Sequence, residues 1–187
     1  MKQSRIRDSL RVTIPARKFF DNKTDMFIDV PETQITLVHS LLSISVWESK
    51  WHKAFLSDNY EKTPEMIRDY IRCMTVGPEP DPLVYVGIPA SVMHEIEQYI
   101  GDPMCATYLR DPPDQPHNRE VVTAELLYYQ MRTLNIWLEC EKWHLNRLLM
   151  LIKVTQRKEE AANKKGGMSN KGLAKSNAHL NRSRKHH

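Results

Sequence analysis

Apolar and polar residues alternate over residues 10–14, a two-residue period that is typical of a half-buried β-strand. Apolar residues return at 19–20 and at 26–30, on either side of the polar segment 21–25, and this pattern predicts a β-hairpin. Residues 35–37 add a third short apolar run. A sheet of this size buries too little apolar surface to be stable alone. We therefore expect it to pack against the segments that follow it.

The apolar spacing changes to three and four residues after position 40, which indicates amphipathic helices. Ser40 is the predicted N-cap of the first helix, and Thr63, followed by Pro64, is the predicted N-cap of the second. The proline-rich stretch 77–82 should end the second helix. The apolar faces expected in these two helices are Leu41, Ile44, Trp47, Trp51 and Phe55, and then Met66, Ile67, Tyr70, Ile71 and Met74.

Three further helices are predicted in the rest of the chain. The first covers residues 91–100 and is closed by Gly101. The second spans about 119–134, and the third begins near Ile136, so Asn135 would form the turn of an antiparallel helical pair. The residues expected to face inward are Val92, Ile96, Tyr99 and Ile100, then Val122, Leu126, Tyr129 and Leu134, and finally Trp137, Cys140, Trp143, Leu148, Met150, Leu151 and Val154.

These elements predict an α+β fold that is predominantly α. A small N-terminal β-hairpin or sheet would pack on a bundle of about five helices, with an extended basic C-terminal tail. We expect one compact domain over residues 1–157, with its β part in 8–37 and its helical part in 40–157. Beyond about Lys158 the apolar period disappears, and residues 158–187 predict a basic flexible tail or arm.

The positive charge of the chain is concentrated in this tail. Residues 157–187 contain nine Lys or Arg and two Glu, whereas the other 156 residues contain 18 basic and 21 acidic side chains. The tail therefore has a charge of +7 and the rest of the chain one of −3, so the excess positive charge behind the net +4 lies entirely in the tail. The tail fits either a solubilising flexible end or an arm that binds an acidic protein or nucleic acid and is ordered by it. Its candidate contacts are Lys164, Lys165, Lys171, Lys175, Arg182, Arg184 and Lys185.

Two residue spacings fit part of a metal site. Glu141 and His144 have the Glu-x-x-His spacing of di-iron helices, and Cys140 would share a helix face with His144. The sequence has no second Glu-x-x-His, and Cys73 and Cys105 lie far from Cys140. An amphipathic helix explains the same residues, so we expect neither a metal nor another cofactor.

Enzyme motifs and export signals are missing as well. The sequence has no Gly-x-Ser-x-Gly elbow and no glycine pattern for phosphate binding, so we expect no enzymatic activity. An odd number of distant cysteines predicts a reducing cytoplasm. No apolar run reaches about 18 residues, and none follows the basic first residues, so neither a membrane helix nor a secretory signal is expected.

The four tryptophans, at positions 47, 51, 137 and 143, are spaced as on two helices. Core packing explains this spacing better than a platform on which nucleic-acid bases stack. Part of the cluster could still be exposed as a docking surface for a partner.

Several segments of the sequence carry a family pattern together. They are His39–Ser45, Trp47–Trp51 and Tyr70–Thr75, then Asn118–Val122 and Tyr128–Tyr129, and finally Glu139–Leu149. With these segments the chain resembles, over residues 8–155, a group of small proteins encoded among the structural genes of long-tailed bacteriophages. The resemblance does not include the basic tail. It implies a role in phage tail biology without an assigned catalytic activity. That gene neighbourhood encodes tail-assembly chaperones, which hold the tape-measure protein while the tail tube polymerises, and components of the tail or head–tail joint.

The expected function is therefore a non-enzymatic interaction in phage tail assembly, of a chaperone-like kind. The helical body would present an apolar groove to a helical partner, with Trp51, Trp143 and Leu149 as candidate contacts. Candidate partners are other tail or virion proteins, including the tape-measure protein, and a second copy of the chain. The alternative is a permanent virion component whose basic arm is threaded between neighbouring subunits, and a weaker alternative is a nucleic-acid binder acting through the tail. The expected location is the host bacterial cytoplasm during assembly, or the mature virion.

Overall fold

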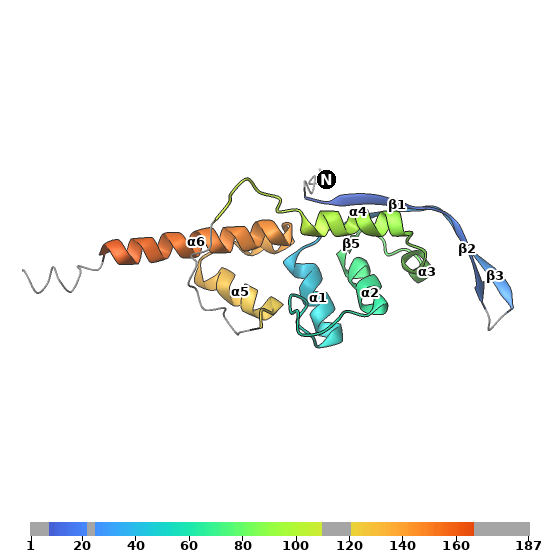
Figure 1. Ribbon diagram of the computed structural model, residues 1–187, viewed down its shortest axis with the longest axis horizontal. Helices are drawn as coiled ribbons and strands as arrows, with labels where there is room; N and C mark the ends of the chain where they lie inside the picture. The colour runs from blue at the N-terminus through green and yellow to red at the C-terminus, as the bar shows by residue number, and fades with distance from the viewer. Residues whose placement is uncertain (1–7, 22–24, 110–120, 167–187) are drawn as a thin grey trace, which may run out of the picture. The chain divides into compact units, whose positions relative to one another are not determined.

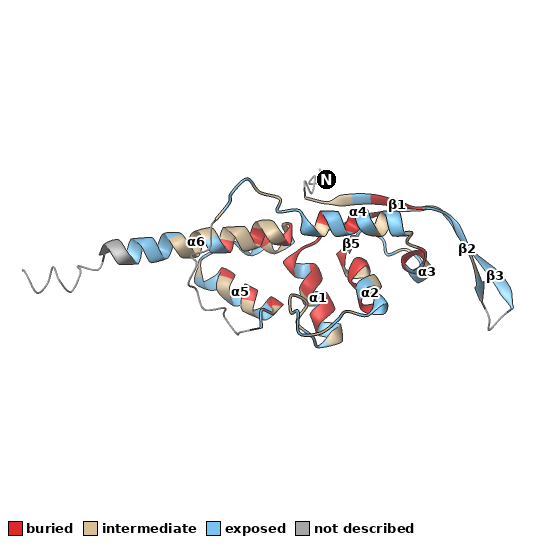
Figure 2. Ribbon diagram, viewed as in Figure 1, coloured by how far each residue is buried: buried red, intermediate tan, exposed pale blue. Residues whose placement is uncertain are grey.

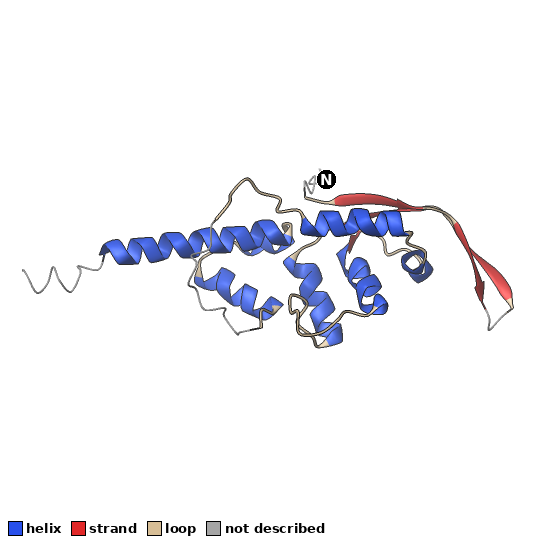
Figure 3. Ribbon diagram, viewed as in Figure 1, coloured by secondary structure: helices blue, strands red, loops and turns tan. Residues whose placement is uncertain are grey.

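The computed structural model describes residues 8–21, 25–109 and 121–166 (Figure 1). The fold is α+β and predominantly α, as predicted, with a small N-terminal sheet and mainly helices after it (Figure 3). The chain consists of two compact units, residues 1–152 and residues 153–187. No helix in the described residues is long and apolar enough to cross a membrane.

The N-terminal strands form two separate sheets. Strands β1 (Leu10–Ile14), β4 (Thr33–Leu37) and β5 (Thr75–Val76) pair in the order β1-β4-β5, and all the pairs are antiparallel. Strands β2 (Arg17–Asp21) and β3 (Met26–Val30) form the predicted hairpin as a two-stranded sheet of its own. The hairpin and the strand at 35–37 are thus confirmed.

The alternation in β1 and β4 explains how the three-stranded sheet packs. Val12 lies opposite Ile35 and Leu10 lies opposite Leu37, so these pairs share one face of the sheet. Val12, Ile35 and Leu37 are buried, whereas Arg11 between them is exposed. The sheet therefore covers the helical core with one face only, as expected for an antiparallel sheet.

The first two long helices begin where their caps predict. In α1 (Leu41–Trp51) the side chain of Ser40 accepts a hydrogen bond from the Ser43 backbone N–H. In α2 (Pro64–Met74) the side chain of Thr63 accepts one from the Met66 N–H. These bonds satisfy N–H groups that have no partner inside the helix. The interior of the molecule forms around their inward faces (Figure 2).

Two predictions for these helices were wrong in detail. Ile67 was expected on the buried face of α2 but is exposed, because Met66, Tyr70 and Met74 already fill the face that meets the core. Phe55 was expected on the face of the first helix but lies beyond the end of α1. Its ring still contacts the ring of Trp47.

The proline-rich stretch ends α2 as predicted and then starts another helix. Asp81 accepts a hydrogen bond from the Leu83 N–H and caps the short helix α3 (Pro82–Val86), which the sequence analysis did not anticipate. Proline suits the first turn of a helix, since the N–H that it lacks would have no partner there. Helix α4 (Ala90–Gly101) follows, close to its predicted bounds, and lies alongside β1 (Figure 1).

The last part of the chain differs most from the prediction. Helix α5 (Ala124–Thr133) is shorter than expected, and Asn135 makes a turn in the left-handed region, with φ of 51°. The next helix was predicted from Ile136, but a short 3-10 helix, η1 (Leu138–Lys142), comes first, and α6 (Leu145–Gly166) begins only after it. The 136–154 region is therefore two elements with a break between them.

The inward face of α5 was also misassigned. Its buried residues are Ala124, Leu127 and Met131, whereas Tyr129 is exposed. Val122 precedes the helix and is exposed as well. Four apolar residues in a row, at 126–129, give no unique helical phase, so the periodicity could not select the face that is buried.

Helical structure also continues further than predicted at the C-terminal side. The apolar period stops near Lys158, yet α6 extends to Gly166. Glu, Ala and Lys are good helix formers, and residues 158–165 consist mostly of them, so no apolar face is needed to continue the helix. Residues 167–187 of the predicted tail lie outside the described residues.

Candidate functional site

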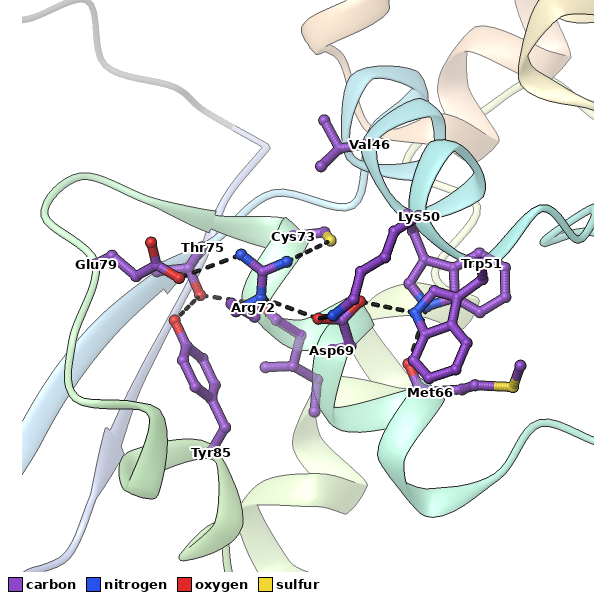
Figure 4. A network of polar contacts seen from close by, with 12 residues as sticks. Val46, Lys50, Trp51, Met66, Asp69, Arg72, Cys73, Thr75, Glu79 and Tyr85 are labelled. Atoms are coloured by element: carbon purple, nitrogen blue, oxygen red, sulfur yellow. Dashed lines mark hydrogen bonds and ion pairs between the residues drawn. The ribbon is translucent and has the colours of Figure 1, made fainter.

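A network of polar side chains connects α1 and α2 around one carboxylate (Figure 4). Asp69 is nearly buried, and its Oδ1 accepts hydrogen bonds from Lys50 Nζ at 2.6 Å and from Arg72 Nε at 3.0 Å. Its Oδ2 accepts one from the indole N–H of Trp51 at 2.8 Å. Both carboxylate oxygens are thus engaged by donors from the two helices.

The donors decide the protonation state of this carboxylate. Burial alone would raise the pKa of Asp69, but the hydrogen bonds from Lys50, Trp51 and Arg72 outweigh it and place the pKa below its usual value. Asp69 is therefore an anion at neutral pH. A buried anion held by two cations and an indole joins α1 to α2, and this clamp orients the Trp51 ring at the surface.

The same network continues along α2 toward α3. Arg72 also donates to Glu79 Oε1 at 3.2 Å, and Tyr85 Oη donates to the hydroxyl of Thr75 at 3.1 Å. Cys73 lies beside Arg72, and burial together with the charge of Asp69 raises the pKa of its thiol to about 11. A thiol with that pKa stays protonated at neutral pH and is a poor nucleophile.

A second cluster, of two histidines and two tyrosines, lies in the core. The Nδ1 atom of His39 lies within hydrogen-bond distance of the Tyr70 hydroxyl, at 2.6 Å. The centroid of the His39 ring is 5.0 Å from that of the His144 ring. The Tyr99 hydroxyl accepts from the His39 backbone N–H at 3.1 Å and donates to the carbonyl of Asp8 at 2.6 Å. The cluster therefore joins the ends of β4 and α4, helix α2 and the start of α6.

The hydrogen bonds of His144 fix its tautomer and explain where α6 begins. Nε2 lies 3.0 Å from the Tyr99 carbonyl, which can only accept, and Nδ1 receives the Asn146 backbone N–H at 3.3 Å. His144 is thus a neutral imidazole with the proton on Nε2. It caps α6 as a serine would, because it satisfies an N–H of the first helical turn. This capping role interrupts the long helix that the spacing predicted.

Burial keeps both rings uncharged. Desolvation lowers the pKa of His39 to about 3, with a smaller effect of the neighbouring His144, and burial also lowers the pKa of His144. Both ring nitrogens of His144 are engaged in hydrogen bonds, so neither is free to bind a metal. Glu141 is engaged elsewhere, since its Oε2 accepts from the Tyr128 hydroxyl at 2.8 Å. Among the described residues no group of three or more His, Cys, Asp or Glu side chains could hold a metal ion.

Glu48 is a buried acid whose role the sequence analysis did not identify. Its Oε1 accepts from the Phe55 backbone N–H at 2.7 Å, and its Oε2 accepts from the Ala124 N–H at 2.8 Å. Ala124 is the first residue of α5, so a carboxylate from α1 caps another helix from the side and interacts favourably with its dipole. An acid directly after Trp47 on the apolar side of a helix was the signal that could have identified it.

The structure places the predicted partner contacts on separate elements. Trp51 ends α1, Trp143 lies between η1 and α6, and Leu149 is in α6; all three are half-buried and pack against the core. The Arg147 guanidinium lies 4.4 Å from the centre of the Trp143 ring and covers one of its faces. Lys164 and Lys165 belong to the last turn of α6, and the structure does not describe their side chains. The other tail contacts, Lys171, Lys175, Arg182, Arg184 and Lys185, lie outside the described residues.

Two groups of exposed apolar side chains were missed by the sequence analysis. Trp137 was expected in the core but is 76% exposed, and Leu138 beside it is 62% exposed. The second group is on the β2–β3 hairpin; we define the hairpin patch as Phe20, Met26, Phe27 and Ile28, all of which are exposed (Figure 2). Tryptophan, with tyrosine and arginine, is enriched among the residues that contribute most to the binding energy of protein–protein interfaces.

An open cavity of about 350 Å³ lies at the base of the hairpin. Lys18 and Asp29 are among its lining residues and form an ion pair, with 3.3 Å between Nζ and Oδ1. Its lining residues are Ala16, Arg17, Lys18, Asp29, Val30 and Pro31. The cavity adds a concave surface next to the hairpin patch.

Family models, curated proteins and solved structures were compared with the chain, and none of them matches.

Proposed function

We propose that the chain is a non-enzymatic protein of a phage tail module that acts by protein–protein interaction during tail assembly, in a chaperone-like role. The observation that carries the interaction role is the exposure of Trp137, the N-cap residue of η1, and of Leu138, its first residue. Exposing two large apolar side chains to water is unfavourable, and a partner that buries them would remove this cost.

The buried polar clusters also support an interaction role. The Asp69, His39–His144 and Glu48 groups are all occupied by hydrogen bonds that hold elements of the fold together. Among the described residues no buried side-chain nitrogen or oxygen lacks a partner. These polar side chains therefore stabilise the fold, and we assign partner binding to exposed side chains instead.

The family resemblance supports the tail assignment. Its two longest segments meet in the structure, since the Leu145 N–H donates to the His39 carbonyl at 2.8 Å. Both segments contribute residues to the core, including Leu41, Ile44, Leu145 and Leu148. Trp137 lies just before the segment Glu139–Leu149 and outside the resembling residues. Because it is exposed, a substitution there can change partner specificity without loss of the fold.

The partner we propose is an amphipathic helical segment of another tail protein, with the tape-measure protein as the first candidate. Such a segment offers apolar residues at every third or fourth position, and two of them could cover Trp137 and Leu138. Glu139 and Glu141 follow directly, so basic residues beside that apolar stripe would complement the site.

Mass spectrometry of purified particles of the encoding phage, compared with infected cells, tests the role. We expect the chain in cells and its absence from particles. A fixed ratio to the major tail protein in particles would replace the chaperone role with that of a permanent virion component.

A second experiment tests the site within that role. Trp137→Ala should reduce the yield of tailed particles at least tenfold, whereas Tyr108→Ala, which also removes an exposed aromatic ring, should not. Circular dichroism should show both variants folded. Equal yields from the two variants would refute the assignment of the contact to Trp137.

A further inference from the structure

The β2–β3 hairpin presents apolar side chains on both of its faces. Phe20 lies opposite Phe27 and their ring centroids are 5.1 Å apart, so these two rings share one face. Phe19 lies opposite Ile28 on the other face, where Phe19 reaches toward Gly87 next to α3. A two-stranded hairpin with exposed apolar residues on both faces is only marginally stable in water by itself.

The outer edge of β3 is open. Within the described residues β3 pairs only with β2, through five consecutive residue pairs without a bulge. Exposed edges are usually protected by proline, lysine or a bulge in the strand. Residues 26–30 contain none of these, and their one charged residue, Asp29, is paired with Lys18. The edge is therefore ready to accept another strand.

We propose that this edge pairs with the same edge of a second copy of the chain. Antiparallel pairing of two β3 strands centred on Ile28 places Ile28 opposite Ile28, Met26 opposite Val30 and Phe27 opposite Asp29. No like charges face each other in this register. A register centred on Phe27 would place Asp25 opposite Asp29 and is disfavoured by their repulsion.

The result is a four-stranded antiparallel sheet. One face carries a continuous apolar row of Phe19, Ile28, Ile28 and Phe19, because Phe19 already lies beside Ile28 in each hairpin. On the other face the Phe20–Phe27 pair of one copy lies beside the Lys18–Asp29 pair of the other. The self-complementary register is the reason to choose a second copy as the occupant, rather than an unrelated strand.

The area of the hairpin patch indicates a weak, reversible dimer. Phe20, Met26, Phe27 and Ile28 are 49%, 64%, 68% and 37% exposed. Taking about 200 Å² for each full side chain, they present roughly 400 Å² per copy, and edge-to-edge pairing covers only part of this area. A standard interface buries about 800 Å² per partner, so we expect a weak dimer with a Kd in the micromolar range or above.

Disulfide trapping tests the register. Ile28→Cys places a thiol on the proposed twofold axis, and mild oxidation should yield a covalent dimer of the full chain. Val46→Cys is the matched control, because Val46 is an exposed aliphatic residue on α1. The unsubstituted chain controls for the native thiols. Dimer formation by Val46→Cys to the same extent, or none by Ile28→Cys, would overturn the proposal.

Sedimentation equilibrium tests the affinity without a cross-link. Ile28→Lys should raise the Kd of the dimer at least tenfold, and Val46→Lys should leave it unchanged. A chain that remains monomeric up to about 0.5 mM, above the micromolar range inferred from the area, would also overturn the proposal. Self-association is independent of whether the chain leaves or stays in phage particles, so the outcome here is distinguishable from that of the proposed function.

Discussion

The buried His39–His144 pair should make the stability of the fold depend on pH in a range where carboxylates do not titrate. His39 has its pKa lowered from 6.5 to about 3 by burial. The unfolded chain then binds a proton at His39 below about pH 6.5, whereas the folded chain does not. Stability from this group is complete above pH 6.5 and is lost as the pH falls from there toward 3.

The expected magnitude follows from the two pKa values. Each pH unit between them lowers the free energy of unfolding by about 1.4 kcal/mol for one histidine. Between about pH 7 and about pH 5 the loss from His39 alone is thus about 2 kcal/mol. The pKa of His144 is lowered in the same direction, so it adds to the loss. Unfolded Asp and Glu titrate at about pH 4 and contribute little in this window.

Urea unfolding at several pH values between about 5 and 7 measures this effect. His39→Asn keeps a polar group near the Tyr70 hydroxyl but cannot be protonated, so its free energy of unfolding should fall much less over the range. His94→Asn removes an exposed histidine and should behave like the natural chain. If the natural chain and His39→Asn lost the same free energy, the buried histidine would not be the cause and the reasoning would be refuted.

Three further predictions concern substitutions whose effect on stability is measured by urea unfolding at neutral pH. Asp69→Ala should lower the free energy of unfolding by about 1–3 kcal/mol, because the partly buried donors Lys50, Trp51 and Arg72 lose their common acceptor, while the exposed Asp58→Ala should change it by less than about 0.5 kcal/mol. Trp47→Ala should cost about 3–5 kcal/mol and Trp137→Ala less than about 0.5 kcal/mol; similar values would contradict the assigned burial. Glu48→Gln should cost about 1–3 kcal/mol through the weakened cap of α5, and an unchanged stability would show that the carboxylate is not needed there.

Local features of the fold could be predicted from the sequence because their causes are local. Ser40 and Thr63 cap helices through N–H groups only three residues away, and the strand 10–14 alternates because one face of a sheet is buried. The hairpin between residues 19 and 30 follows from two apolar runs around a polar turn. Such signals lie within a few residues and need no knowledge of the rest of the fold.

The polar clusters could not be predicted because their partners are distant in the chain. Glu48 caps a helix that begins 76 residues later, and His144 binds a carbonyl 45 residues before it. Held by this bond, His144 caps α6, so the continuous helix that Trp137 and Trp143 suggested is interrupted, and Trp137 is exposed. Helical spacing shows which residues could share a face, but contacts across the fold decide whether that face exists.

The contact between Arg147 and Asp8 has a consequence for synthesis in the cell. The two side chains form an ion pair at 3.0 Å and are 139 residues apart in the chain. A ribosome adds about 5–20 residues per second, so roughly 7–30 s separate the synthesis of the first residue from that of the second. During this interval β1 can pair with β4, but the strand start at Asp8 lacks its guanidinium partner. All three strands of the β1-β4-β5 sheet have been translated by Val76, whereas the ion pair that holds Asp8, two residues before β1, can form only after Arg147 has been added.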